Sequence, residues 1–218
     1  VFQHLKIKTI IAEHNCCNAA GVALGKSGKL RQKMEFLTQK LLQQAGDDRK
    51  VLFLEPSCLL TVKLEYPKIL RSAAAGKLAA KSMDATDFAA SIMMSNEIVS
   101  SFGRIPLRIY YHNPCHHKVL GAGEITMQLL QKIPGMTVIS DGDACCSMAG
   151  TFGLKKRFFD LSLKIGDHLF KSIEKARPDF VATPCTGCAL QIEQATGYKI
   201  LHPAQLIAAA LDLEPLPE

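Results

Sequence analysis

Short stretches with the character of β-strands alternate along this chain with longer stretches of helical periodicity. Leu5–Ile11 alternates apolar and polar residues as a half-buried strand does, and Met136–Ile139 has the same character. Val51–Leu54, Leu107–Tyr111 and Phe180–Ala182 are short apolar runs that also predict strands. Strands that alternate with helices favour parallel β-α-β units with right-handed crossovers, so the pattern predicts an α/β protein.

Apolar side chains at helical spacing fill most of the remaining chain. They predict helices over 30–42 and 158–173, each between a predicted strand and the next one. Another helix is expected over 124–132. Asp84 is a suitable N-cap for a helix that would run to about Val99, and 100–106 then forms a linker.

Eight cysteines fall into two similar groups. The Cys16-Cys17 pair is followed by Cys58 after 40 residues. A second adjacent pair is followed by a cysteine after 38 residues and another after 41. Each pair lies between a predicted strand and a predicted helix. The sequence therefore predicts two Rossmann-like parallel-sheet βαβ repeats related by internal duplication, over 1–103 and 104–218. The first group of cysteines is Cys16, Cys17 and Cys58, and the second group is Cys115, Cys145, Cys146, Cys185 and Cys188.

The first repeat is expected to be truncated at its N-terminus. Leu107–Tyr111 and Cys115 precede the cysteine pair of the second repeat, and the first repeat has no counterpart of either. Val1 is not a methionine, and no signal pattern follows it. We therefore expect the sequence to be a piece of a longer chain, with a strand and a cysteine lying upstream.

Metal binding explains these cysteines better than disulfides do. Adjacent cysteines bridge to each other only with strain, and disulfide scaffolds are usually shorter secreted chains. The five cysteines of the second group all follow predicted strands, whose carboxyl ends share one edge of a parallel sheet. Five thiols without acidic or histidine residues in register favour iron and sulfide over a catalytic zinc site, which uses mixed ligands and water.

Composition and motifs exclude several other classes. A chain that is 48% hydrophobic and 21% charged is typical of a folded globular protein, and no apolar run is long enough to cross a membrane. The net charge of +6 is spread along the chain, without the basic clusters of a nucleic-acid-binding protein. Gly25-Lys26-Ser27 suggests a phosphate loop, but Ala20 replaces the glycine that this motif requires. We therefore expect FAD only in a partner subunit.

Five segments together resemble the cysteine-rich CCG-domain family, which includes the subunit designated B of heterodisulfide reductase and the iron-sulfur subunits of glycolate and lactate oxidation. Within this family the second half is most similar to the C-terminal part of the iron-sulfur subunits of anaerobic glycerol-3-phosphate dehydrogenases, in which a ferredoxin-like segment precedes the domain pair. The segments are Asn15-Cys16-Cys17, Glu55-Pro56-Ser57-Cys58, Tyr111-His112-Asn113-Pro114-Cys115-His116, 145–156 and Pro184-Cys185-Thr186-Gly187-Cys188.

The resemblance implies a complete cofactor site in the second repeat. All five family positions are matched there by Cys115, Cys145, Cys146, Cys185 and Cys188, which would bind an iron-sulfur cluster of the 4Fe-4S or noncubane type. In the first repeat only Cys16, Cys17 and Cys58 match, Glu55 stands in place of a cysteine, and zinc is the alternative to a cluster. Asn18 and Ser147 replace the family glycine.

Two histidines flank Cys115. His112 and His116 would lie just outside the ligands, where they could tune the potential of a cluster or relay a proton. The other interpretation is that they only fix the loop through hydrogen bonds.

The implied function is electron transfer in an oxidoreductase complex, with no catalytic residue and no complete activity in this chain alone. Its partners would be a flavoprotein dehydrogenase subunit of the glycerol-3-phosphate type and a membrane-associated quinone-linked subunit. The expected location is the cytoplasm. A second expectation is that the chain is attached peripherally to the cytoplasmic face of the inner membrane. Alternatives are a heterodisulfide reductase-like subunit, a glycolate or lactate oxidase iron-sulfur subunit, and a zinc-stabilised assembly module.

Overall fold

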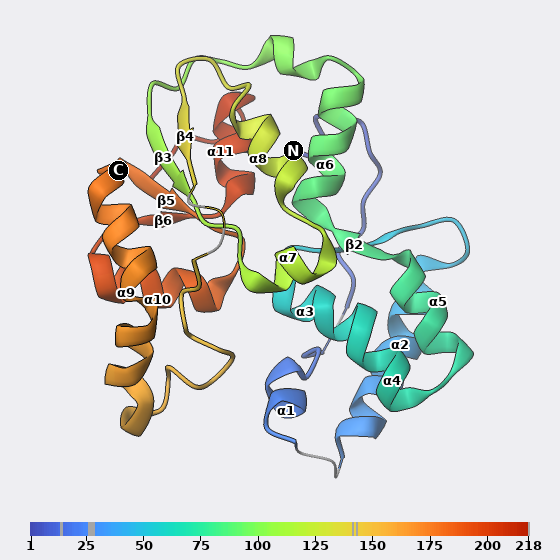
Figure 1. Ribbon diagram of the computed structural model, residues 1–218. Helices are drawn as coiled ribbons and strands as arrows, with labels where there is room; N and C mark the ends of the chain where they lie inside the picture. Colours follow the sequence, from blue (N-terminus) through green and yellow to red (C-terminus); the bar gives the residue numbers. More distant parts are fainter. Residues whose placement is uncertain (14, 26–28, 141, 143, 218) are drawn as a thin grey trace.

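A computed structural model describes residues 1–218 except 14, 26–28, 141, 143 and 218 (Figure 1). Its strands form two sheets in which every pair is parallel. β1 (Val51–Phe53) pairs with β2 (Ser82–Asp84). The second sheet has the order β4-β3-β5-β6, formed by Thr137–Ile139, Arg108–Tyr111, Phe180–Ala182 and Ile200–Leu201. The α/β class expected from the sequence is confirmed.

Helices account for most of the rest of the described chain. Up to residue 103 they are α1 (Ala19–Ala23), α2 (Leu30–Ala45), α3 (Pro56–Leu60), α4 (Tyr66–Leu70), α5 (Ala73–Lys81) and α6 (Ala85–Ser95), with a π-helical turn over Thr61–Glu65 and a 3-10 turn over Ile98–Ser101. After residue 103 the helices are α7 (Cys115–Leu120), α8 (Glu124–Leu130), α9 (Phe159–Ala176), α10 (Thr186–Thr196) and α11 (Pro203–Ala210), with a 3-10 turn over Lys156–Phe158. Residues 1–103 and 104–218 are called the N-terminal and C-terminal parts below, and this division stays a prediction.

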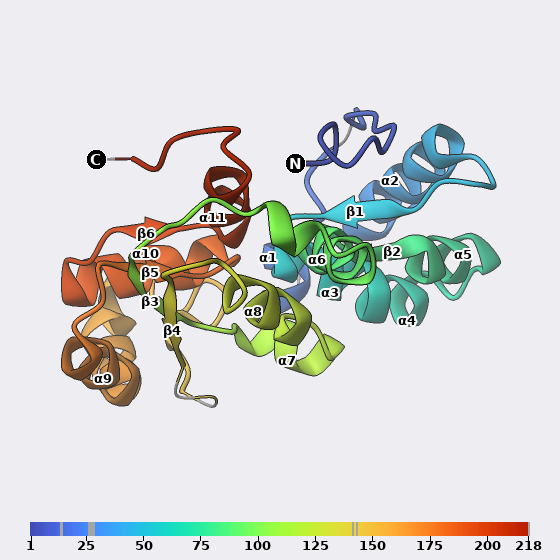
Figure 2. The same ribbon diagram turned by 90° about the horizontal axis from the view of Figure 1, so that it is seen from above.

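The two parts are joined through helices. α6 lies beside α8, and Met93 of α6 shares one apolar core with Ile109 of β3 and Ile207 of α11 (Figure 1). α3 packs on α7, so the segment after β1 lies beside the segment after β3. Seen from above, α3 and α6 lie next to β1, and α7 and α8 lie on the side of them that faces the four-stranded sheet (Figure 2). The carboxyl end of β1 is thus close to the carboxyl ends of β3 and β5.

The predicted strand over Leu5–Ile11 is wrong. Residues 2–6 form turns, and 7–13 have no regular structure. Lys6 has a φ of 56°, which is incompatible with a strand, and the N–H of Leu5 donates to the carbonyl oxygen of Val1. Phe2 and Leu5 are partly buried and pack against the apolar core that contains α6 instead. The partner of β1 is β2, which the sequence pattern did not predict.

The predicted helix from Asp84 begins where expected but ends early. One Asp84 carboxylate oxygen accepts the N–H groups of Thr86 and Asp87 at 2.8 and 2.9 Å, so Asp84 is the N-cap of α6. α6 ends at Ser95, and a 3-10 turn replaces the last predicted helical turn. The remaining predicted helices and strands are found with shifts of a few residues at their ends. The Gly25-Lys26-Ser27 run lies largely outside the described residues.

Candidate metal centre

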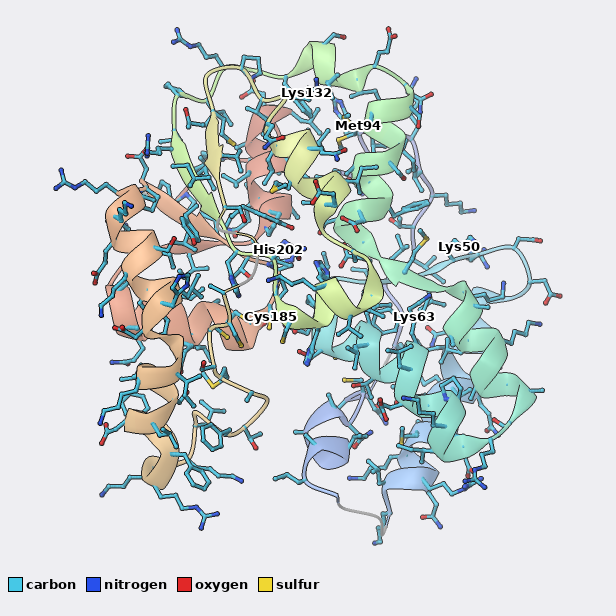
Figure 3. All side chains as sticks on the ribbon, viewed as in Figure 1. Lys50, Lys63, Met94, Lys132, Cys185 and His202 are labelled. Atoms are coloured by element: carbon cyan, nitrogen blue, oxygen red, sulfur yellow. The ribbon has the colours of Figure 1, made fainter. Side chains whose placement is uncertain are left out.

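The five cysteines of the second group lie at one edge of the four-stranded sheet. Cys115 is the first residue of α7, just beyond β3, and Cys145 and Cys146 follow β4. Cys185 is the N-cap of α10, just beyond β5, and Cys188 lies in the first turn of that helix. Figure 3 labels Cys185, which lies toward the middle of the molecule, where the two parts meet. Parallel pairing brings these positions together because it places the carboxyl ends of all the strands on one side.

Side-chain hydrogen bonds connect the five sulfurs into a continuous series. Cys115 is hydrogen-bonded to Cys145, and Cys145 is hydrogen-bonded to Cys146. The Sγ of Cys146 lies 3.0 Å from the Sγ of Cys188, and Cys188 is also hydrogen-bonded to Cys185. Cys146, Cys185 and Cys188 are buried, whereas Cys115 and Cys145 reach the surface. All eight cysteines of the chain lie among the described residues and are free thiols.

Protons are unevenly distributed along this series. The hydrogen bond with Cys115 holds the pKa of Cys145 well below its usual range, and it raises the pKa of Cys115 in return. The hydrogen bond with Cys145 raises the pKa of Cys146 to about 12, and the bond with Cys146 raises the pKa of Cys188. The bond with Cys188 lowers the pKa of Cys185. Thiolate therefore concentrates at Cys145 and Cys185, and a bound metal would displace the protons held by the other three.

Backbone N–H groups are directed at the sulfurs. Ser147 donates its N–H to the Sγ of Cys145 at 3.3 Å, and Met148 donates to Cys146. The N–H groups of Gly187 and Cys188, at the start of α10, point to the sulfur of Cys185. Such bonds favour the charged form of a thiol, so the loops are arranged to hold thiolates.

A buried polar network fixes the loop that carries Cys145 and Cys146. Ser147 has a φ of 63°, in the left-handed region, where the family has a glycine. Its carbonyl oxygen accepts the hydroxyl of Ser162 of α9 at 2.7 Å, and Gln191 of α10 donates to that hydroxyl at 2.7 Å. All three residues are buried. No periodicity or spacing in the sequence signals this network.

The helix beneath this loop approaches it closely at Gly166. A Cβ on Gly166 would lie 2.6 Å from the Phe170 ring and 3.0 Å from the carbonyl oxygen of Cys146. We expect Gly166→Ala to lower the free energy of unfolding by about 1–3 kcal/mol, as overpacking does, and to weaken metal retention. Gly76→Ala is the matched control, because α5 has open space there; it should stabilise the protein by about 0.5–1 kcal/mol. Urea unfolding measures both variants, and stabilisation of both would show that no close packing exists at Gly166.

The two histidines beside Cys115 have different surroundings. His112 is 3% exposed, and its ring lies within 4.8 Å of the sulfurs of both Cys146 and Cys188. The Nδ1 of His116 lies 3.0 Å from the hydroxyl of Ser57 in the N-terminal part, and burial lowers the pKa of His116. His112 is thus at the sulfurs, whereas His116 joins the two parts of the chain.

The first cysteine group is smaller. Cys17 and Cys58 share a hydrogen bond, which lowers the pKa of Cys17 to about 7. Asn18 has a φ of 60°, and its N–H donates to the Sγ of Cys16 at 3.3 Å, as Ser147 does to Cys145. The two cysteine pairs therefore sit in the same kind of turn, with three thiols at one and five at the other.

Glu55 connects the first group to the second. One of its carboxylate oxygens accepts the N–H of Thr186 at the start of α10 at 2.9 Å, and the other accepts the N–H and hydroxyl of Ser57. Burial raises the pKa of Glu55, but these hydrogen bonds outweigh it, so the pKa is lowered overall. The residue that stands in place of a family cysteine therefore fixes the N-terminus of the helix that carries Cys188.

The lowered pKa of Glu55 predicts a pH-dependent contribution to stability. This contribution is complete above the unfolded-state pKa, about 4.3, and is lost as the pH falls through the lower folded-state pKa. Wild-type protein should therefore lose more free energy of unfolding between about pH 5 and pH 3 than Glu55→Gln does. Urea titrations at both pH values test this, with Glu174→Gln on the exposed face of α9 as the control. Equal pH slopes for wild type and Glu55→Gln would contradict it.

Several known proteins are similar to this chain. Residues 109–193 match the family described as a cysteine-rich domain, CCG. The chain is 29% identical to the subunit designated C of anaerobic glycerol-3-phosphate dehydrogenase from Escherichia coli (strain K12) over 206 residues, 93% of this chain and 51% of that protein. It is 24% identical to the subunit designated D of dihydromethanophenazine:CoB–CoM heterodisulfide reductase from Methanosarcina barkeri over 192 residues, 84% of this chain and 45% of that protein.

A third relative shares only part of the chain. The glycolate oxidase iron-sulfur subunit of Escherichia coli is 27% identical over 109 residues, 49% of this chain and 26% of that protein. The chain is a homologue of the glycerol-3-phosphate dehydrogenase and heterodisulfide reductase subunits, and it spans about half the length of these curated relatives.

Proposed function

We propose that this chain is the iron-sulfur electron-transfer part of an oxidoreductase complex similar to anaerobic glycerol-3-phosphate dehydrogenase. The observation that carries the proposal is the continuous series of five sulfurs at the sheet edge, in a chain homologous to one of the subunits of that enzyme. Electron transfer needs a redox group that the protein holds close to its surface. Cys115 and Cys145, at the exposed end of the series, provide that position.

The donor set fits an iron-sulfur cluster. Thiolates are the ligands that these clusters use, and the second group offers five thiols. When bound there, the cluster would supply one-electron chemistry. The ligands would be Cys115, Cys145, Cys146, Cys185 and Cys188. The chain itself would tune the site through burial, N–H groups directed at sulfur and the Ser147 loop.

The partners are those that the family resemblance implies, and they are part of the proposal. FAD would be bound by a flavoprotein dehydrogenase subunit that oxidises a glycerol-3-phosphate-type substrate, and electrons would pass toward a membrane-associated quinone-linked subunit. The described helices include none with the length and apolar character needed to cross a bilayer. As a further part of the proposal, the chain would lie in the cytoplasm and contact the inner membrane peripherally through these partners.

Anaerobic reconstitution with iron and sulfide tests the proposal. The reconstituted chain should contain iron and acid-labile sulfide, and its reduced or oxidised form should give an EPR signal. Zinc at full occupancy without labile sulfide would overturn the electron-transfer function. It would support the zinc-stabilised assembly module instead.

Thiol or disulfide chemistry is the second candidate function, favoured by the homology to a heterodisulfide reductase. The exposed sulfur of Cys145, whose pKa is lowered, is where a disulfide substrate could approach. Reduction of a heterodisulfide by the isolated, reconstituted chain with an artificial electron donor would favour this candidate. Electron transfer without any disulfide turnover would favour the first.

A further inference from the structure

The ring of His112 and two buried sulfurs form a compact group of possible metal ligands. One ring nitrogen and the sulfurs of Cys146 and Cys188 all lie within 4.8 Å of one another. A metal ion with bonds of about 2.0–2.3 Å holds tetrahedral ligand atoms about 3.3–3.8 Å apart. The three atoms are therefore close enough to share one metal ion after small side-chain adjustments.

Three different segments hold this group in place. The N–H of His112 donates to the carbonyl oxygen of Ala182 at 2.9 Å, which extends the β3–β5 pairing by one residue. Cys188 is fixed by α10, and Cys146 by the loop that Ser162 supports. All three ligand residues are buried, at 3–4% exposure. The group is therefore part of the rigid sheet edge.

The other histidines nearby have a different orientation. His116 is bonded to Ser57, and the Nε2 of His117 lies 2.9 Å from a carboxylate oxygen of Asp84. Of the three histidines between β3 and the end of α7, His112 is the one whose ring lies at the sulfurs. A nitrogen of the imidazole ring is a good donor to the same borderline metals that thiolates bind.

We propose that His112 is a nitrogen ligand of the metal centre, beside Cys146 and Cys188. For an iron-sulfur cluster the assignment rests on the proposed function. The chemistry differs from that of an all-cysteine site, because a neutral imidazole adds no negative charge. Mixed histidine and cysteine ligation raises the reduction potential of an iron-sulfur centre relative to cysteine alone.

Pulsed EPR of reconstituted protein labelled with ¹⁵N-histidine tests direct ligation. The wild-type spectrum should contain the strong hyperfine coupling of a directly bound nitrogen. That coupling should disappear in His112→Ala and His112→Gln and persist in His168→Ala, because His168 is an exposed residue of α9. Circular dichroism confirms that each variant is folded. A coupling that persists in both His112 variants, or one as weak as that of an N–H···S hydrogen bond, would overturn the proposal.

Cobalt(II) titration of the metal-free chain separates this inference from the proposed function. Thiolate-to-cobalt absorption reports binding, and both His112 variants should lower the affinity by at least about 10–100-fold relative to wild type and His168→Ala. If wild type forms no iron-sulfur cluster but binds cobalt(II) in this way, the proposed function fails and His112 is still a ligand. If a cluster forms without histidine coupling and the affinities are equal, His112 is not a ligand and the proposed function stands.

Discussion

Cys146→Ser is expected to abolish cluster assembly in the C-terminal part. Cys146 lies in the middle of the sulfur series and is hydrogen-bonded to Cys145 on one side and to Cys188 on the other. A serine hydroxyl is a hard oxygen donor and replaces a thiolate poorly at a site for soft metals. The loss of affinity should exceed the roughly 10–100-fold that removal of an outer hydrogen-bond partner costs. Iron and sulfide analysis and the EPR signal after anaerobic reconstitution measure it.

Cys58→Ser is the matched control. Cys58 is bonded to Cys17 in the first group and belongs to no part of the five-sulfur series. Its replacement should leave the iron content and the EPR signal of the second site nearly unchanged. Zinc that remains in Cys146→Ser and disappears in Cys58→Ser would assign zinc to the first group. If instead Cys58→Ser removes the signal and Cys146→Ser preserves it, the two sites have been assigned the wrong way round.

The convergence of the five cysteines could be predicted because it follows from local patterns. Apolar runs at 107–111 and 180–182 identify strands, and the cysteines come directly after them. Once the strands are taken to be parallel, their carboxyl ends must share an edge. The same reasoning fails at Leu5–Ile11, where Leu5 packs on the α6 core but Ile10 and Ile11 are exposed, and the segment has no regular structure. Alternation alone guarantees neither the burial of the apolar side chains nor a partner strand.

The contacts between the two parts could not be predicted from the sequence. Glu55 and Thr186 are 131 residues apart, and no periodicity connects them. In the sequence Glu55 is only a departure from the family pattern, whereas in the structure its carboxylate accepts the N–H of Thr186 at the start of α10. The different orientations of His112 and His116 are also invisible in the sequence, because both flank Cys115. They differ because His112 extends β3, whereas His116 lies on the face of α7 that meets α3.

Asp84→Ala is expected to cause a large loss of stability. One carboxylate oxygen of Asp84 caps α6, and the other lies 2.9 Å from the Nε2 of His117. Both side chains are 2% exposed or less. Alanine would remove the cap and leave a buried imidazole without this partner, so the free energy of unfolding should fall by about 2–5 kcal/mol. Urea unfolding followed by circular dichroism measures the change.

The same substitution should reach the metal centre through α7. His117 lies two residues after Cys115 on this short helix, so the Asp84–His117 contact anchors the ligand at the exposed end of the sulfur series. We expect Asp84→Ala to lower the iron content as well as stability, and Asp84→Asn, which preserves an oxygen for the α6 cap, to cost less in both. Asp47→Ala is the control, because it removes an exposed carboxylate paired with Lys77 and should change neither measurement appreciably. Stability losses in Asp84→Ala no larger than those in Asp47→Ala would show that the buried pair does not join the two parts.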